Sequence, residues 1–113
     1  MNREKITILF VINTNKTNQK GFCSISCRIT LNKARKQFAT GLFVNPHYWE
    51  NKLQKVNVQE ANHKYINAQL ERIQIKIYNI ALVFQLQGIE LKLDNIFSEY
   101  KGIPIKKEEY IRS

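Results

Sequence analysis

Apolar and polar residues alternate from Phe22 to Leu31. The apolar side consists of Cys23, Ile25, Cys27, Ile29 and Leu31. The other side consists of Phe22, Ser24, Ser26, Arg28 and Thr30. A period of two with one apolar side predicts an antiparallel strand with one face in the core and one face in water.

Two further strands are expected on either side of this one. The β-branched run "KITILFVIN" predicts a strand, and the polar run "NTNKTNQKG" after it predicts a loop that holds Lys16 and Lys20. Residues 34–41 predict a returning strand after a turn at Asn32 and Lys33. A two-residue turn requires a positive φ at Lys33, where glycine is preferred, so a longer turn with a shifted register stays open.

The two-residue turn also predicts which residues face each other. On the polar face, the pairs are Thr30 with Arg35, Arg28 with Gln37, and Ser26 with Ala39. On the apolar face, the pairs are Ile29 with Lys36, Cys27 with Phe38, and Ile25 with Thr40. Only Lys36 disagrees with this division, and its long side chain can extend from the sheet edge into water.

The apolar spacing changes to three and four residues in the second half of the chain. Asn45-Pro46 predicts the start of a turn or short helix. Asn57 and Glu60 resemble a capping box, and Gly88 is typical of a helix C-terminus, so a helix of about 28 residues is expected between them. Its apolar stripe is Ile66, Leu70, Ile73, Ile77, Ile80 and Phe84. A second row, Ile75, Tyr78 and Leu82, predicts that the helix packs against more than the small sheet.

A short helix is expected from Leu93-Asp94 to Gly102. The predicted fold class is therefore α+β, with a three-stranded antiparallel sheet packed on a long C-terminal helix and a short terminal helix after it. Residues 1–88 are expected to form one domain, and residues 89–113 the short helix and a linker.

Positive charge is concentrated in the first half of the chain. The 113 residues include 18 Lys and Arg and 9 Asp and Glu, which gives a net charge of +9. No acid occurs between Glu4 and Glu50, whereas seven bases do. This imbalance favours a polyanion, either nucleic acid or an anionic membrane surface. Because the bases lie in strands and no apolar run approaches the length of a membrane span, a soluble intracellular protein that binds nucleic acid is expected.

The sequence predicts no catalytic chemistry. His47 and His63 have no carboxylate or nucleophile at a telling spacing, and no metal ligand set or phosphate-binding loop occurs. Cys23 and Cys27 would lie roughly 13 Å apart on one strand, too far for a disulfide, so buried reduced thiols are expected. No cofactor, metal or small-molecule substrate is predicted.

The polar face of the predicted hairpin suggests a contact with double-stranded DNA. Arg can bind guanine, Gln can bind adenine, and Ser or Thr can bind bases or phosphates. The candidate base-reading residues are Ser26, Arg28, Thr30, Arg35 and Gln37. Lys33 at the turn, with Lys16 and Lys20 in the preceding loop, would reach flanking phosphates. The competing interpretation is an ordinary solvated sheet face that its bases keep soluble.

The stretch "GFCSISCRITLNKARKQFATGLFVNPHYWENKLQKV" resembles the N-terminal segment of Bacteroides-type mobile-element integrases of the tyrosine recombinase (phage integrase) family. The resemblance covers about residues 5–102, although "NKAR" stands at the turn where Asn-Gly is commoner. Its motif positions are Gly21, Ile25, Arg28-Ile29, Lys36, Thr40-Gly41, Pro46, Trp49 and the step from Ile66 through Asn67 to Leu70.

The resemblance implies an arm-type DNA-binding domain whose sheet lies in the major groove at arm sites flanking a recombination site. In the intact enzymes, a core-binding domain and a catalytic domain with a tyrosine nucleophile follow, and 113 residues leave no room for them. The chain therefore looks like a non-catalytic fragment of a bacterial cytoplasmic enzyme, and Tyr110 is not assigned as the nucleophile.

Two other functions remain open. The chain could be a protein-interaction module that contacts other recombinase subunits through the long helix. The same sheet face could also bind RNA.

Overall fold

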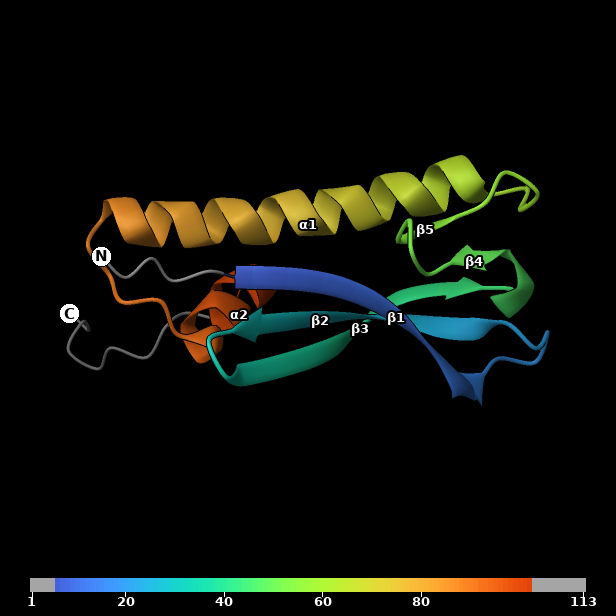
Figure 1. Ribbon diagram of the computed structural model, residues 1–113, viewed down its shortest axis with the longest axis horizontal. Coiled ribbons are helices and arrows are strands. Elements are labelled where there is room, and N and C mark those ends of the chain that lie inside the picture. Colours follow the sequence, from blue (N-terminus) through green and yellow to red (C-terminus); the bar gives the residue numbers. More distant parts are fainter. Residues whose placement is uncertain (1–5, 103–113) are drawn as a thin grey trace.

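Three antiparallel strands form a sheet in the order β1-β2-β3 in the computed structural model, which describes residues 6–102. The strands are β1 (Ile6–Thr17), β2 (Cys23–Leu31) and β3 (Ala34–Val44). A 3-10 turn η1 (Pro46–Tyr48) and a small hairpin of β4 (Trp49–Glu50) and β5 (Lys55–Val56) connect the sheet to helix α1 (His63–Leu86). The last element is helix α2 (Leu93–Lys101). Helix α1 runs along one side of the sheet, and α2 lies near the end of the sheet that holds the β2–β3 turn (Figure 1).

The alternation in β2 separates a buried face of the sheet from an open one, as the sequence predicted. Ile25, Cys27 and Ile29 have 0% of their surface exposed. They belong to one core that includes Phe10 of β1 and Ile77 of α1. We call this side of the sheet, which both helices cover, the inner face, and the opposite side the outer face. Burial of each large aliphatic side chain contributes about 1.5–3 kcal/mol, so the inner face is the main source of stability.

The β2–β3 hairpin has the predicted register over most of its length. Thr30 pairs with Arg35, Arg28 with Gln37, Ser26 with Ala39, Ile29 with Lys36, and Cys27 with Phe38. The positive φ of the two-residue turn falls at Asn32 (57°) rather than at Lys33. Asparagine tolerates the left-handed region better than most residues, which explains why the turn forms without glycine.

One predicted pair is wrong, because β3 contains a bulge. Ile25 pairs with Leu42 instead of Thr40. Thr40 and Gly41 are the extra residues, and Gly41 has a φ of +85°. The Thr40 hydroxyl donates to the Ile25 carbonyl at 2.7 Å and accepts from the Leu42 amide at 3.1 Å. Because two residues are inserted, β3 keeps the same side chains on the same faces.

Strand β1 is longer than the sequence predicted, and it includes Lys16. Its pairing with β2 is regular to Asn13 and resumes at Thr17 after an irregular segment. The turn that follows is held by Asn18, whose side-chain oxygen accepts from the amides of Lys20 (2.9 Å) and Phe22 (3.0 Å). The polar composition of this segment suggested a loop, but a strand can continue through polar residues where both of its sides face water.

Helix α1 has 24 residues and begins at His63, so the prediction that it starts at Asn57 is wrong. The Asn57 side chain instead accepts from the Gln59 amide at 2.8 Å, and a Glu60 carboxylate oxygen accepts from the Asn62 amide at 3.1 Å. These polar residues form a turn before the helix. The predicted stripe is otherwise close to the observed one, with these α1 residues buried: Ile66, Leu70, Ile77, Ala81 and Phe84.

The predicted C-terminus of α1 at Gly88 is confirmed. Gly88 has a φ of +73°, and the Ile89 amide donates to the Phe84 carbonyl at 2.8 Å. This hydrogen bond closes the helix in a Schellman motif, after which the chain turns back toward the sheet. Residues Leu91, Leu93 and Ile96 then enter the same core as β2.

Helix α2 covers the edge of the inner face along β3. The ring of Phe38 lies 5.6 Å from that of Phe97 and 5.1 Å from that of Tyr100, measured between centroids. Lys36, the one basic residue on this face, reaches an Asp94 carboxylate oxygen at 3.4 Å. The sequence pattern placed Lys36 on the apolar face, where a charge does not fit. Its side chain extends to the sheet edge, where the ammonium meets a carboxylate of α2.

Two amide side chains attach the β4–β5 hairpin to the rest of the fold. Gln54 binds both backbone groups of Phe10 on the edge strand β1, accepting at 2.6 Å and donating at 3.0 Å. Asn67 of α1 binds both backbone groups of Val56, accepting at 2.8 Å and donating at 2.9 Å. The polar residue inside the "Ile-Asn-x-x-Leu" step of the helix therefore joins α1 to β5.

We expect Asn67→Ala to lower the free energy of unfolding by about 1–3 kcal/mol, because the backbone groups of buried Val56 lose this partner. Urea denaturation followed by circular dichroism measures the change. Asn79→Ala is the matched control, since Asn79 is an exposed residue on the same helix, and its stability should change by less than about 0.5 kcal/mol. Equal stability of the two variants would contradict the role given to Asn67.

Candidate nucleic-acid interface

The outer face of the sheet is organised as rows of three side chains, one from each strand. The strand registers place Thr7, Thr30 and Arg35 in the first row, counted from the β2–β3 turn. Leu9, Arg28 and Gln37 form the second row, and Val11, Ser26 and Ala39 the third. Because the strands alternate, all of these side chains leave the sheet on the side opposite α1.

The two arginines of the hairpin lie on the same face, as the sequence predicted. Arg28 is half-buried in the central strand, and Arg35 is exposed on the edge strand. The Arg28 Nε donates to the Gln37 side-chain oxygen at 3.2 Å. A guanidinium carries five N–H donors, so this bond orients Arg28 across the face and leaves its terminal donors free for a ligand.

The three predicted phosphate-binding lysines lie at the two ends of the sheet. Lys33 is exposed in the β2–β3 turn, Lys16 is exposed near the end of β1, and Lys20 is exposed in the β1–β2 turn. The two turns lie at opposite ends of the sheet (Figure 1). Of the acids that the structure describes, none precedes Glu50, so none belongs to β1, β2 or β3. The sheet thus presents positive charge along its length without a carboxylate that would repel a phosphate.

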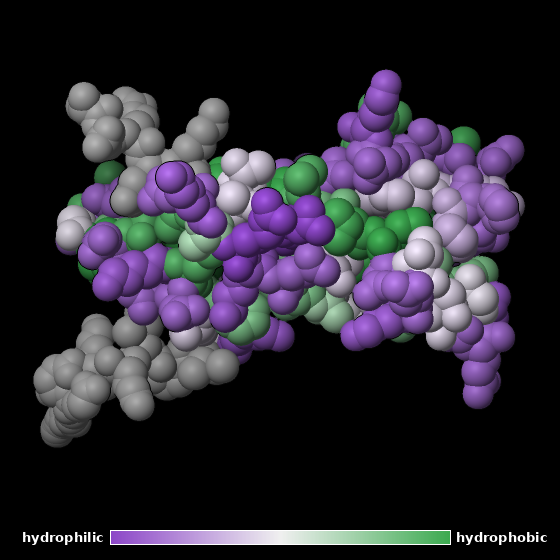
Figure 2. Space-filling view, turned by 60° about the horizontal axis from the view of Figure 1, so that its bottom comes forward, coloured by the Kyte–Doolittle hydropathy of each residue, from purple (hydrophilic) through white to green (hydrophobic). Residues whose placement is uncertain are grey.

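Seven of the eight predicted site residues keep a partly or fully accessible surface, and Ser26 does not. Ser26 has 7% of its surface exposed, because it is a small residue between Val11 and Ala39 on the neighbouring strands. Figure 2 views the molecule from below the sheet, and hydrophilic groups cover much of this side with hydrophobic groups between them.

Sequence reasoning missed the contribution of β1 to this face. Thr7, Leu9 and Val11 pair with Thr30, Arg28 and Ser26 and therefore belong to the outer face. The run "ITILFV" is apolar at nearly every position, so its pattern could not show which residues point outward. The register with β2 supplies that information.

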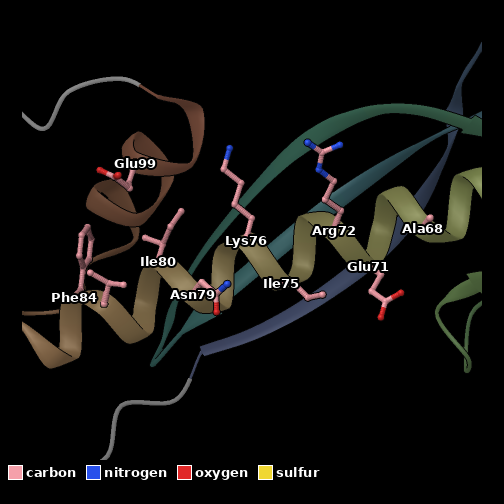
Figure 3. A pocket seen from close by; sticks show the side chains of 10 residues that line it. Ala68, Glu71, Arg72, Ile75, Lys76, Asn79, Ile80, Phe84 and Glu99 are labelled. Carbon is pink, nitrogen blue, oxygen red and sulfur yellow. The ribbon is translucent and has the colours of Figure 1, made fainter.

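A second surface lies on α1. A groove runs beside the helix and α2, and its lining includes Arg72, Lys76, Ile80 and Glu99 (Figure 3). The predicted second row is exposed, with Ile75 at 52%, Tyr78 at 39% and Leu82 at 51%, and Ile75 also lines the groove. The sheet does not cover this row. The prediction that the helix packs on more than the sheet is confirmed by other elements, because α1 also contacts α2 and β5.

The two cysteines lie in the core, and His63 lies at the start of α1. Cys23 and Cys27 are free and buried, and burial raises the pKa of the Cys27 thiol to about 12, so that thiol stays protonated at neutral pH. The His63 ring lies 2.9 Å from the Glu60 carbonyl at the start of α1. Within residues 6–102, no three His, Cys, Asp or Glu side chains gather as a metal site. No helix in that range is long and apolar enough to cross a membrane. Tyr110 lies outside the described residues.

Residues 10–97 match a family model described as an arm DNA-binding domain. The match runs from Phe10 in β1 into α2, so it includes β2, β3, the β4–β5 hairpin and α1. No curated protein and no solved structure matched the chain.

Proposed function

Because the chain belongs to the family of arm DNA-binding domains, we propose that the outer face of its sheet binds double-stranded DNA in a sequence-specific manner. In this proposal, the target is an arm site beside a recombination site. The chain acts as the N-terminal, non-catalytic domain of a tyrosine recombinase from a mobile element. The observation that carries the proposal is the joint position of Arg28 and Arg35 on an acid-free face whose reverse side is sealed by helices.

The dimensions of the sheet suit the major groove of DNA. Neighbouring strands lie about 4.8 Å apart, so three strands span roughly 10 Å between their outer backbones. The major groove of B-DNA is about 12 Å wide and displays the base edges. A three-stranded sheet can therefore place its outer face toward those edges, while α1 and α2 stay on the side away from the DNA (Figure 1).

The exposed side chains have distinct proposed roles. Arg28 and Arg35 donate to guanine, Gln37 binds adenine, and Thr30 bonds a base or a phosphate. Ser26 is 7% exposed, so its hydroxyl has a smaller part in the proposed contact than these side chains. Lys33 binds phosphate at one end of the sheet, and Lys16 and Lys20 bind phosphate at the other, which fixes the register of the protein on the duplex.

We expect Arg28→Ala to weaken binding to the preferred duplex by about 1–3 kcal/mol and to relax the preference at one base pair. The probe is a duplex selected by the parent protein from a randomised library, and fluorescence anisotropy measures the affinity. Thermal unfolding should be nearly unchanged, because Arg28 points out of the core.

Lys20→Ala should instead weaken binding to all duplexes alike and reduce the slope of log affinity against log salt by about 0.9.

Arg72→Ala is the matched control, since it removes the same charge from α1 rather than from the outer face. It should keep the base preference of the parent. If Arg28→Ala bound every duplex as tightly as the parent, the assignment of the outer face to the groove would be wrong. Stronger binding of a sequence-matched RNA duplex would favour RNA instead, although the deep and narrow major groove of A-form RNA cannot admit a sheet.

A second candidate function is a protein contact through α1, with another recombinase subunit as the partner. The exposed row of Ile75, Tyr78 and Leu82 supports it, together with Val83 (46%) and Leu86 (77%) on the same helix. A surface helix usually turns only one apolar stripe inward, and α1 already does so against the sheet. A cluster of exposed apolar side chains on its other side is typical of an interaction surface.

This second function predicts self-association that does not require DNA. Sedimentation in about 1 M salt, where the Debye length is about 3 Å, should still show a dimer or larger species. Leu82→Glu should return the protein to a monomer and leave the affinity for duplex DNA unchanged, because Leu82 is exposed on α1, away from the outer face. A parent protein that stays monomeric under these conditions would exclude this contact between copies of the chain.

A further inference from the structure

The outer face carries apolar side chains that the proposed contacts with guanine, adenine and phosphate leave unused. Leu9 lies beside Arg28, and Val11 and Ala39 lie on either side of Ser26. Phe43 pairs with Ser24 in the row beyond. Leu9 and Phe43 leave the sheet on the side away from the core, and they are 41% and 39% exposed although both are apolar.

This composition differs from that of an ordinary solvated sheet face. The water-facing side of an antiparallel sheet normally carries polar residues at these positions. Here the two charged groups, Arg28 and Arg35, and the neutral amide of Gln37 occupy the two rows nearest the β2–β3 turn. The apolar groups begin at Leu9 and continue through the rows toward the β1–β2 turn. The apolar side chains of the outer face thus lie between the arginines near the β2–β3 turn and the lysines at the β1–β2 end.

The major groove of DNA offers a matching apolar group. Of the four bases, only thymine displays a methyl group there, and aliphatic or small side chains contact it. We propose that Leu9, Val11 and Ala39 contact thymine methyl groups and so contribute to base specificity, an inference that rests on the proposed binding of DNA by the outer face. Ser26, which is 7% exposed, lies between Val11 and Ala39, so the two apolar side chains flank a small residue on this face.

The strand geometry predicts where these thymines lie relative to the guanine. Leu9 is one strand away from Arg28, and Ala39 is two residues along β3 from Gln37. Those separations are about 5 Å across the sheet and about 7 Å along it. Successive bases rise by about 3.4 Å, so the thymines are expected within about two base pairs of the guanine that Arg28 reads.

The test replaces thymine by deoxyuridine, which removes the methyl group and keeps the base pair. The probe is the duplex that the parent protein selects from a randomised library, with each thymine replaced in turn. Loss of a buried methyl group should weaken binding about fourfold, and only for thymines near the selected guanine. Leu9→Ala should bind the thymine duplex more weakly than the parent and lose its sensitivity to deoxyuridine at one position.

Leu53→Ala is the matched control, because it truncates an exposed leucine (62%) between β4 and β5, outside the three-stranded sheet. It should retain the full sensitivity to deoxyuridine. Leu9 is exposed, so its truncation should leave thermal unfolding nearly unchanged, which separates a lost contact from a lost fold. Ala39→Gly offers a second variant on the opposite edge strand.

The outcomes separate this inference from the proposed function. If the parent protein bound the thymine and deoxyuridine duplexes equally, the methyl contact would be wrong and DNA binding by the outer face would stand. If deoxyuridine weakened the parent, Leu9→Ala and Ala39→Gly by the same factor, the methyl contact would belong to other residues, and the assignment would fail. If the protein selected no duplex at all, both the inference and the proposed function would be overturned.

Discussion

Burial of one side of β2 beneath the helices is the constraint on which the rest of this structure depends. Ile25, Cys27 and Ile29 have no exposed surface, so the residues between them must point the other way. A slip of one residue in the register would exchange the two faces and move Arg28 into the core. An unpaired charge buried there would cost several kcal/mol, so the stability of the core and the orientation of the candidate DNA-binding side chains have the same cause.

The remaining elements keep the outer face open by packing on the inner one. Helix α1 lies along the inner face, and α2 adds Phe97 and Tyr100 against Phe38 at its edge. At the other edge, Gln54 binds the backbone of Phe10, which satisfies polar groups that an exposed strand would otherwise present to another chain. The sheet is thereby braced at both edges, and no helix or strand within residues 6–102 crosses the outer face (Figure 1). A braced sheet holds side chains in fixed rows, as recognition of base edges requires.

Charge and shape have different parts in the proposed recognition. The lysines at the two ends of the sheet supply attraction to any duplex, and this attraction weakens with salt. The rows between them supply discrimination, through the donors of Arg28 and Gln37 and through the apolar groups around Ser26. The hydrogen bond between Arg28 and Gln37 links two of these side chains before any ligand arrives. A preoriented pair loses less conformational entropy on binding than two independent side chains would.

The sequence by itself determined the α+β class, the two faces of β2, most of the β2–β3 register and the C-terminus of α1, because periodicity and glycine position are local properties. It also located the charge imbalance, since that needs only counting. Tertiary structure alone decided the bulge at Thr40-Gly41, the extension of β1 to Thr17 and the late start of α1 at His63. Each of these depends on hydrogen bonds between segments far apart in the chain or on turns whose polar residues also suit a helix cap. Tertiary structure likewise decided which side of the uniformly apolar β1 joins the outer face, because only pairing with β2 distinguishes Leu9 from Phe10.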